Sequence, residues 1–235
     1  SEKFVNRLYN MGVNNPIDLG IKGEPNPKIP HPSENDWNGL SLPWMSYGYG
    51  ILLTPLQILS FYNGIANNGE MVKPTFLEST SKLGSTNFYE FKKEIINPSI
   101  CSKKTLSIVQ KMLLDVIHHK NGTAKNIKSE HIKIAGKTGT AQIGYGTDEI
   151  NYISSFVGYF PADQPKYSCI VVVNSPNKDI GYYGSDVAAP VFKRIAEKIS
   201  SRFPIIEKHN YKQIIDKIKI SKKQNKSNHK NKLDS

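Results

Sequence analysis

Three apolar segments follow one another in the second half of the chain, and their order constrains the fold more than any other feature. Residues 131–135 run into the stretch Lys137-Thr138-Gly139-Thr140, and two segments rich in β-branched and aromatic residues follow at 154–160 and 167–173. The last two flank Pro-Ala-Asp-Gln-Pro, which predicts a hairpin with a five-residue loop. A helix predicted for residues 184–200 is long enough to cover the resulting antiparallel sheet.

The sequence before these strands predicts helices. Thr54 is a candidate N-cap, Pro55 follows it at the first helical position, and Gln57 can close a capping box. Apolar residues at helical spacing predict a second helix at about 103–119 and a short one within residues 1–15. Residues 16–43 contain six prolines and are predicted to be a loop or linker. The fold class is therefore α+β, an antiparallel sheet with helices packed on it plus a helical region.

The net charge of +11 is concentrated at one end of the chain. Nine lysines and only three acidic residues lie between Glu207 and Ser235, which accounts for about +6. We therefore expect a basic, disordered tail at 204–235 and place the folded domain at 1–203. The remaining charge is unremarkable for 206 residues, so we do not expect nucleic acid as a partner.

Cysteine usage and hydropathy exclude several classes of protein. Cys101 and Cys169 lie far apart without a Cys-x-x-Cys or Cys/His spacing, so neither a metal site nor a disulfide framework is expected. Cys169 lies in an apolar run and is interpreted as a buried, inert thiol. No segment reaches the about 18 apolar residues of a membrane-spanning helix. The chain opens on Ser1 rather than Met, which indicates either processing or a piece of a longer protein.

The Lys-Thr-Gly-Thr stretch has the side chains that a carboxylate-binding strand edge needs. Lys137 supplies positive potential, and the hydroxyls of Thr138 and Thr140 can donate hydrogen bonds to a carboxylate. Gly139 leaves room for a ligand that lies against the strand. An extended peptide could then pair with the edge, and a backbone N–H could point at a developing oxyanion.

Several short motifs around this stretch occur together in one known family. They are Gly122-Thr123-Ala124, Ile134 to Gln142, Ser155 to Asp163, Ser46-Tyr47-Gly48-Tyr49-Gly50 followed by Thr54 to Gln57, Ile65 to Gly69, Lys73-Pro74 and Val187 to Phe192. In order and spacing, residues from about Phe4 to Ile199 resemble the C-terminal half of the transpeptidase domain of class B penicillin-binding proteins. Lys-Thr-Gly is one of the motifs of these serine acyl-transfer enzymes. The Pro43-Trp44-Met45 run resembles the division (septal) branch.

The resemblance implies a fold, an activity and a location. The fold would be part of the penicillin-binding, serine β-lactamase-like fold, and the activity that of a serine-type D,D-transpeptidase with no cofactor or metal. Such an enzyme cross-links D-Ala-D-Ala stem peptides of peptidoglycan during septal cell-wall synthesis and is acylated by β-lactams. The implied partners are divisome membrane proteins. The implied location is the extracytoplasmic face of the inner membrane, although this chain shows no membrane anchor.

The resemblance also implies roles for individual residues. Lys137 would act electrostatically on a serine of a Ser-x-Asn motif, and the backbone N–H of Thr140 would form half of an oxyanion hole. The implied substrate-binding residues are Thr138, Gly139, Thr140, Gln142 and Tyr49. For Tyr49 and its neighbour Tyr47, packing between the glycines is the competing interpretation. Loop or core packing is favoured for Trp44.

The family's nucleophilic serine, in Ser-x-x-Lys, and its Ser-x-Asn both precede the matched region, so we expect them upstream of residue 1. Short matches to these patterns do occur in the chain, but out of order. They are Ser79 to Lys82, Ser175 to Lys178, Ser85 to Asn87, Ser33 to Asn35 and Ser227 to Lys230. We interpret them as chance matches and predict that this chain alone is inactive.

Two other classes of function remain open from the sequence. The chain could be a non-catalytic scaffold or pseudo-enzyme segment that binds division partners and uses its basic tail for acidic surfaces. A β-lactamase or a D,D-carboxypeptidase fits less well, because a class A β-lactamase would not carry the Thr54 to Gln57 helix start.

Overall fold

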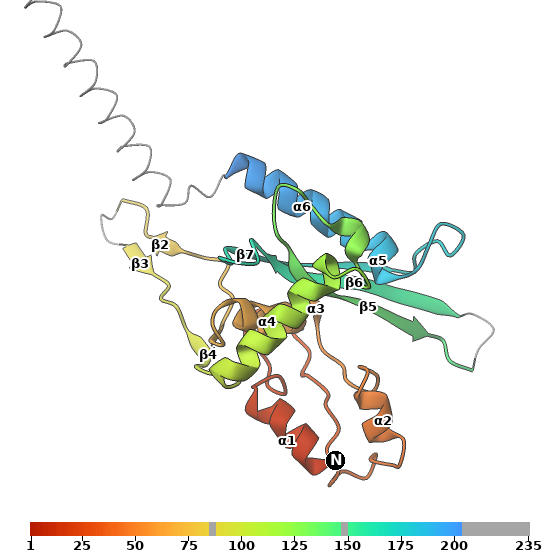
Figure 1. The fold of residues 1–235 in the computed structure, drawn as a ribbon. Helices are drawn as coiled ribbons and strands as arrows, with labels where there is room; N and C mark the ends of the chain where they lie inside the picture. The colour runs from red at the N-terminus through yellow and green to blue at the C-terminus, as the bar shows by residue number, and fades with distance from the viewer. Residues whose placement is uncertain (85–87, 147–149, 204–235) are drawn as a thin grey trace, which may run out of the picture. The chain divides into compact units, whose positions relative to one another are not determined.

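The computed structural model describes residues 1–84, 88–146 and 150–203, and residues 1–197 form one compact unit (Figure 1). The predicted tail at 204–235 lies outside the described residues. The helices are α1 (Glu2–Asn10), α2 (Ser41–Met45), α3 (Pro55–Ala66), α4 (Lys103–His118), α5 (Gly184–Val187) and α6 (Ala189–Arg202), with a 3-10 turn at Lys125–Ile127. The strands are β1 (Met71–Val72), β2 (Ser79–Ser81), β3 (Phe88–Glu90), β4 (Ile95–Asn97), β5 (Ala135–Ile143), β6 (Asn151–Phe160) and β7 (Tyr167–Asn174).

Helix α3 begins with the predicted capping box. The side chain of Thr54 accepts a hydrogen bond from the N–H of Gln57 at 3.1 Å, and the Gln57 side chain accepts one from the N–H of Thr54 at 2.8 Å. Pro55 occupies the first helical position, where its missing N–H costs nothing. The prediction of this helix start is confirmed.

Replacing Thr54 by alanine is expected to lower the free energy of unfolding of the full chain by about 1 kcal/mol, because one N-terminal N–H loses its acceptor. Urea denaturation checks this value. The variant Thr54→Ser keeps the hydroxyl and should retain most of the stability. Equal losses in both variants would contradict a capping role.

The central sheet has the order β5-β6-β7, and both strand pairs are antiparallel. The predicted hairpin of the last two strands is confirmed, with residues 161–166 as its connection. The prediction of a strand at 131–135 is wrong, because β5 begins at Ala135 and runs through the Lys-Thr-Gly stretch to Ile143. The apolar alternation at 132–134 reflects buried side chains in an irregular segment rather than a strand that ends at the motif.

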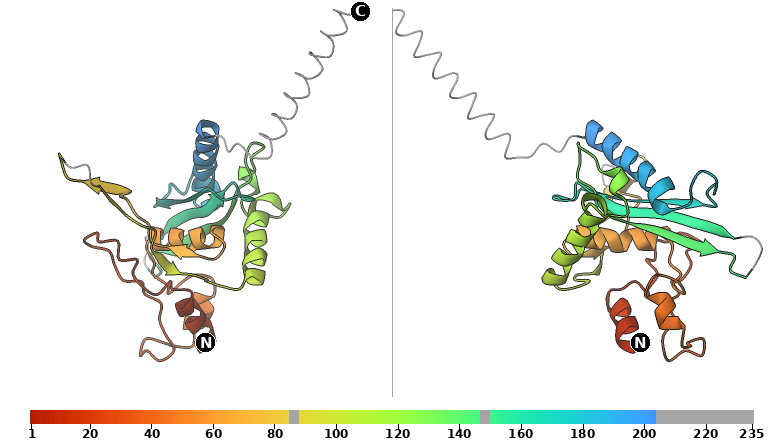
Figure 2. Two further views of the ribbon diagram at one scale, coloured as in Figure 1. Left: turned by 90° about the vertical axis from the view of Figure 1, so that its left-hand side faces the viewer. Right: turned by 45° about the vertical axis from the view of Figure 1, so that its right-hand side comes forward.

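Helices cover both faces of this sheet (Figure 1, Figure 2). On one face, Ala135 and Tyr159 pack in a buried cluster with residues of α3 and α4, such as Ile65 and Leu106. On the other face, Phe192 of α6 lies edge-on against Phe156 at a centroid distance of 4.8 Å. Fully burying side chains of this size contributes about 1.5–3 kcal/mol each. The sheet is therefore held from both sides, consistent with the predicted α+β class.

The single helix predicted at 184–200 is two helices. Pro190 has no N–H to donate to a residue one turn earlier, and Ala188 separates α5 from α6. The apolar residues Val187, Val191, Ile195 and Ile199 recur at helical spacing and predict one core-facing stripe. The buried residues of α6 are instead Ala189, Phe192 and Ala196. Two of these three residues are alanines, and small side chains contribute little to apolar periodicity, so the sequence did not indicate this face.

Helix α4 ends one residue before its predicted boundary, but one of the apolar residues at helical spacing, Met112, lies outside the core. Ser102 caps the helix by accepting a hydrogen bond from the N–H of Thr105 at 3.2 Å. Leu106, Leu113 and Ile117 are buried as expected, whereas 62% of Met112 is exposed. The helix thus buries a narrower stripe than its sequence indicates.

The first 50 residues pack around a small second cluster. Val5 of α1, Ile29 and Met45 of α2 are buried together there. A β-bridge between Lys28 and Leu52 ties the predicted loop to the start of α3. The loop prediction for residues 16–43 is correct up to residue 40, where the short α2 begins.

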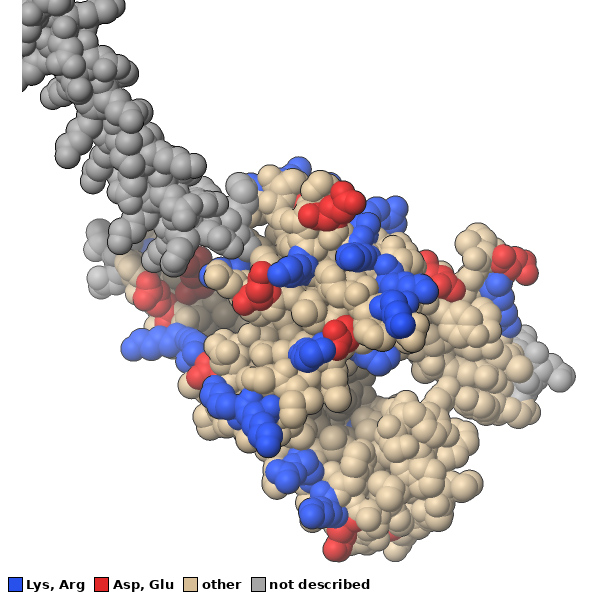
Figure 3. All heavy atoms as spheres, viewed as in Figure 1, with Lys and Arg blue, Asp and Glu red and all other residues tan. Residues whose placement is uncertain are grey.

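The surface of the described part mixes charges. Figure 3 shows basic side chains scattered over one face with acidic side chains among them, not gathered into one patch. The β2–β3 hairpin exposes apolar side chains, including Phe88 and Tyr89 at 65% each. Within the described residues, no helix combines the length and the apolar character needed to cross a membrane.

Candidate active site

The Lys-Thr-Gly stretch lies in the middle of β5, an edge strand of the three-stranded sheet. β5 pairs with β6 over its whole length, from Ala135 opposite Tyr159 to Ile143 opposite Asn151. Among the described residues no strand pairs with its other edge. The backbone of this free edge is therefore available to a ligand.

Side chains of the motif alternate between the two faces of the sheet. Gly139 faces the same way as its partner Ser155, since a Cβ at Gly139 would lie 2.5 Å from the Ser155 hydroxyl. Thr140 points to the opposite face, where its Oγ1 accepts a hydrogen bond from the N–H of Gly184 at 2.9 Å. That bond fixes the motif to the N-terminus of α5.

Lys137 curls around the free edge of the strand. Its ammonium donates to the carbonyl oxygen of Thr138 at 2.8 Å and to the hydroxyl Oγ1 of Thr138 at 3.2 Å. Desolvation by neighbouring atoms lowers the pKa of Lys137, although the residue as a whole is exposed. The cation and the first threonine hydroxyl therefore form one group, suited to an anionic ligand.

Thr123 also lies beside the group of Lys137 and Thr138. The sequence analysis did not assign Thr123 to the site. The Thr123 hydroxyl lies 3.4 Å from that of Thr138. The turn that carries it is tight, because a Cβ at Gly122 would lie 2.3 Å from the carbonyl oxygen of Val116. The Gly-Thr-Ala sequence after α4 was the only sequence signal for Thr123. It does not indicate a contact with β5, because the two segments are distant in sequence.

Tyr49 and Gln142 are brought together at the far end of the strand. The backbone N–H of Gln142 donates to the Tyr49 hydroxyl at 2.8 Å, and the Tyr145 hydroxyl donates to the same oxygen at 2.9 Å. The hydrogen bond to Tyr49 raises the pKa of Tyr145 to about 12. Tyr49 thus contacts the motif strand directly and does not only pack between its glycines.

The direction of the Gln142 N–H also shows which other backbone N–H groups of β5 point away from β6. It points away from β6, and backbone groups along a strand alternate with a period of two residues. The N–H groups of Thr138 and Thr140 therefore also point outward at the free edge. A ligand along this edge meets two backbone donors beside the lysine and the hydroxyls.

Three tyrosines that the sequence analysis missed lie beside Thr140. Tyr152 of β6 stacks on Tyr182 at a centroid distance of 4.2 Å, and Tyr182 contacts Tyr183 at 4.5 Å. The Ser154 hydroxyl donates to the carbonyl oxygen of Tyr182 and holds this segment against β6. Since Gly184 bonds to Thr140, the tyrosines form an aromatic wall on the α5 side of the motif.

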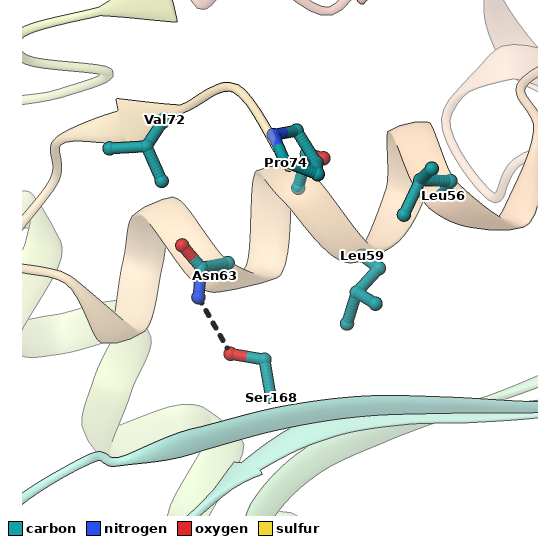
Figure 4. A pocket seen from close by; sticks show the side chains of 7 residues that line it. Leu56, Leu59, Asn63, Val72, Pro74 and Ser168 are labelled. Atoms are coloured by element: carbon teal, nitrogen blue, oxygen red, sulfur yellow. Dashed lines mark hydrogen bonds between the residues drawn. The ribbon is translucent and has the colours of Figure 1, made fainter. Parts of the chain in front are cut away.

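Two cavities differ in their relation to the motif. One of about 590 Å³ is lined by the turn at Gly48–Gly50 and by Ala141 to Ile143 of β5, so it adjoins the motif strand. A smaller one of about 210 Å³ lies at the opposite edge of the sheet, between α3 and the start of β7 (Figure 4). There Asn63 donates to the Ser168 hydroxyl at 3.0 Å. Only the first cavity extends the candidate site.

The short serine patterns lie elsewhere. Ser79 to Lys82 falls on the exposed β2–β3 hairpin, Ser33 to Asn35 on an exposed loop, and Ser175 to Lys178 directly after β7. Ser85 to Asn87 and Ser227 to Lys230 lie outside the described residues. Within the described part of the chain, no hydrogen bond links these serines to Lys137–Thr140. The chance interpretation of the three described patterns agrees with this placement.

Comparisons with known proteins match most of the chain to one family. Residues 1–197 match the penicillin binding protein transpeptidase domain. The peptidoglycan D,D-transpeptidase FtsI of Buchnera aphidicola is 33% identical over 184 residues, which is 77% of this chain and 30% of the relative. FtsI of Escherichia coli K12 is 28% identical over 201 residues, which is 83% of this chain and 31% of the relative.

Solved structures agree with the sequence matches. A crystal structure of penicillin-binding protein 3 from Mycobacterium tuberculosis is similar with a TM-score of 0.74 and 27% identity, over 88% of this chain and 48% of that one. The same protein in complex with aztreonam gives a TM-score of 0.73 at the same identity and coverage. The chain spans about a third of the length of these curated relatives and about half of this solved chain.

Proposed function

The chain belongs to the penicillin-binding protein transpeptidase family, and from this membership we propose that it forms the substrate-binding part of a peptidoglycan D,D-transpeptidase of septal cell-wall synthesis. In this proposal residues 1–203 are the C-terminal part of the transpeptidase domain. The relatives named peptidoglycan D,D-transpeptidase support this activity.

The free edge of β5 is the single observation that carries the proposal. A stem peptide that ends in D-Ala-D-Ala is extended and carries a terminal carboxylate next to the scissile amide. Lys137 with the Thr138 hydroxyl suits the carboxylate, and the outward N–H of Thr140 suits the oxygen of the scissile carbonyl. Gly139 lies between them in the strand, and the Ser155 hydroxyl occupies the space that a Cβ at this position would need.

The chemistry proceeds by two acyl transfers. A serine hydroxyl, which we place outside this chain, attacks the carbonyl carbon of the penultimate D-alanine. The amide C–N bond breaks, an ester forms on the serine, and the terminal D-alanine leaves with the proton. The amine of a neighbouring stem then attacks the ester, forms the cross-link and returns the hydroxyl. Here Lys137 and the Thr140 N–H stabilise the negative charge on the carbonyl oxygen and the carboxylate.

The remaining proposals follow from the same activity. β-Lactams would acylate the same serine, and the complexes of penicillin-binding protein 3 from Mycobacterium tuberculosis with aztreonam and ampicillin support β-lactam binding. We place the protein at the extracytoplasmic face of the inner membrane, where peptidoglycan is cross-linked, with divisome membrane proteins as partners. No metal or cofactor is needed for these steps.

Labelling with a fluorescent penicillin tests the proposal. The longest product of the gene should form a covalent fluorescent band on a denaturing gel, because the nucleophile and the β5 edge are then present together. An excess of unlabelled penicillin should abolish the band. The 235-residue chain alone should give no band.

Two results would contradict this account. A band on the 235-residue chain would show that the nucleophile lies within it. A folded longest product that stays unlabelled would favour the non-catalytic scaffold, in which the β5 edge binds division partners and forms no acyl-enzyme.

A further inference from the structure

The net charge outside the basic tail is carried by one segment of the chain. Residues 103–133, which form α4 and its connection to β5, contain seven lysines and two acidic residues. The other residues within 1–206 contribute fifteen basic and fifteen acidic side chains, so their charges balance. The proposed function uses none of these seven lysines. A local excess of charge on a folded surface attracts partners of the opposite sign.

Helix α4 has two opposite faces. Leu106 and Leu113 pack in the buried cluster that holds Ala135 and Tyr159 of the sheet. The opposite face is mostly exposed, and Figure 2 shows α4 at the outside of the described part. We call this face the outer stripe of α4. Its residues recur at the helical spacing i, i+4, i+7, i+8 and i+11, and they are Lys104, Ile108, Lys111, Met112 and Asp115.

Two apolar side chains in the middle of the outer stripe are open to solvent. Ile108 is 48% exposed and Met112 is 62% exposed. They lie four residues apart, so they are neighbours on the helix surface. Methionine adapts its shape to a partner and is common at protein-binding surfaces. The pair therefore offers an apolar contact to another protein.

Lysines on both sides of this apolar pair are available to a partner. Lys111 already pairs with Asp115 at 2.6 Å. Lys104 and Lys120 form no ion pair with any described residue. Lys104 precedes the apolar pair along α4, and Lys120 follows it just beyond the end of the helix. A carboxylate that approaches either lysine would gain attraction without breaking an existing ion pair.

We propose that the outer stripe of α4 docks an acidic amphipathic helix of a partner protein. The apolar face of that helix covers Ile108 and Met112, and its flanking carboxylates pair with Lys104 and Lys120. A phosphate polymer would gain nothing from the exposed apolar pair, and a membrane surface requires a wider apolar face than two side chains. An amphipathic helix meets both features, since it presents apolar anchors at helical spacing beside its charges.

Two synthetic peptides of identical composition test the proposal with the longest product of the gene. Both consist of the same leucine, glutamate and alanine residues. In the first the leucines recur at i, i+3, i+4 and i+7 and form one helical face, whereas in the second they are spread around the helix. Fluorescence anisotropy measures the binding of each. The amphipathic peptide should bind roughly fivefold more tightly or better, because it alone can cover Ile108 and Met112 together.

The comparison of the two peptides also removes the contribution of the basic tail. Both peptides carry the same charge, so attraction by the tail cancels from the ratio of their affinities. Equal binding of the two peptides would overturn the proposal, since charge alone would then explain the binding. Absence of saturable binding of the amphipathic peptide up to about 1 mM would overturn it as well.

Charge reversal at Lys104 assigns the binding to the outer stripe. Lys104→Glu replaces an attraction by a repulsion and should weaken the amphipathic peptide roughly fivefold or more. Lys22→Glu is the matched control, because Lys22 is an exposed lysine of the loop before α2 and its replacement changes the net charge equally. Salt screens charges that lie far apart, so the control should stay within about twofold of the unaltered protein.

Replacement of Met112 tests the apolar contact. Met112→Gln keeps the helix propensity of this exposed position, so the fold should persist, as circular dichroism can verify. The amphipathic peptide should bind about threefold more weakly, and the binding of the rearranged peptide should not change. Binding that neither Lys104→Glu nor Met112→Gln alters would overturn the proposal.

Vesicles of phosphatidylglycerol provide the remaining test. Cosedimentation with these vesicles that Met112→Gln abolishes, without any binding of the amphipathic peptide, would assign the outer stripe to a membrane surface and overturn the proposal. None of these measurements uses penicillin labelling. Their outcome is therefore independent of the proposed transpeptidase activity.

Discussion

Replacing Lys137 by alanine should slow acylation by fluorescent penicillin at least about 100-fold in the longest product of the gene, with little change in the free energy of unfolding. Removing one positioned electrostatic group from an acyl-transfer site typically costs 10²–10³ in rate. Lys137 is exposed, and its only hydrogen bonds among the described residues go to Thr138, so the fold does not depend on it. The acylation rate is measured on denaturing gels of labelling reactions quenched at successive times.

Lys133 provides the matched control for this prediction. It is also an exposed lysine, two residues before β5, and it forms a surface ion pair with Asp163 at 3.6 Å. Such pairs contribute about 0–1 kcal/mol, so Lys133→Ala should label at the unaltered rate. If Lys137→Ala matched Lys133→Ala, the role of Lys137 in the site would be wrong.

The lowered pKa of Lys137 gives the same prediction a pH dependence. The ammonium form is present below the pKa and is lost as the pH rises through it. Because desolvation places this pKa below the usual 10.5, acylation should decline on the alkaline side earlier than an ordinary lysine would cause. The Lys137→Ala variant should lack this decline. The comparison therefore distinguishes the titration of Lys137 from the titration of other groups.

Gly184→Ala is expected to lower the free energy of unfolding strongly. A Cβ there would lie 2.4 Å from the carbonyl oxygens of both Gly139 and Ser155, which are backbone atoms that cannot turn away. Inserting a methyl group into such packing costs about 1–3 kcal/mol, and the upper end is expected here. The shift should also break the hydrogen bond to Thr140 and slow penicillin labelling.

Gly39→Ala is the control, because a Cβ at Gly39 would meet no atom within 4 Å and its backbone is not left-handed. Its free energy of unfolding should stay within about 0.5 kcal/mol of the unaltered protein. Urea denaturation of both variants and of the unaltered chain gives the comparison. A Gly184→Ala protein as stable as Gly39→Ala would mean that α5 does not press on the motif strand.

Local hydrogen bonding explains why some elements could be predicted from the sequence. The start of α3 depends on Thr54 and Gln57, two residues within one turn, so the pattern contains the whole interaction. The hairpin of β6 and β7 is similar, since its strands are neighbours in the chain. The start of β5 was misplaced because the alternation at 132–134 describes burial and not pairing, and pairing depends on a distant partner.

The residues of the candidate site likewise divide into those that could be predicted from the sequence and those that could not. Lys137, Thr138 and Thr140 were predicted because the motif itself is contiguous. Thr123 and Tyr182 were missed, since their contacts join segments 15 and 28 residues away in sequence. Nothing in a tyrosine pair before a glycine indicates which strand it will pack against. Such contacts depend on how segments distant in sequence pack against the sheet.

The hydrogen bond from Gly184 to Thr140 has a consequence for drug exposure, given the proposed function. It sets the position of the motif strand partly from the face of the sheet opposite to that of Gly139. A bacterial lineage under antibiotic selection could therefore alter its susceptibility through substitutions in α5 that act on the motif strand rather than on the drug itself. Surveillance limited to the residues that contact the inhibitor would overlook such a resistance route.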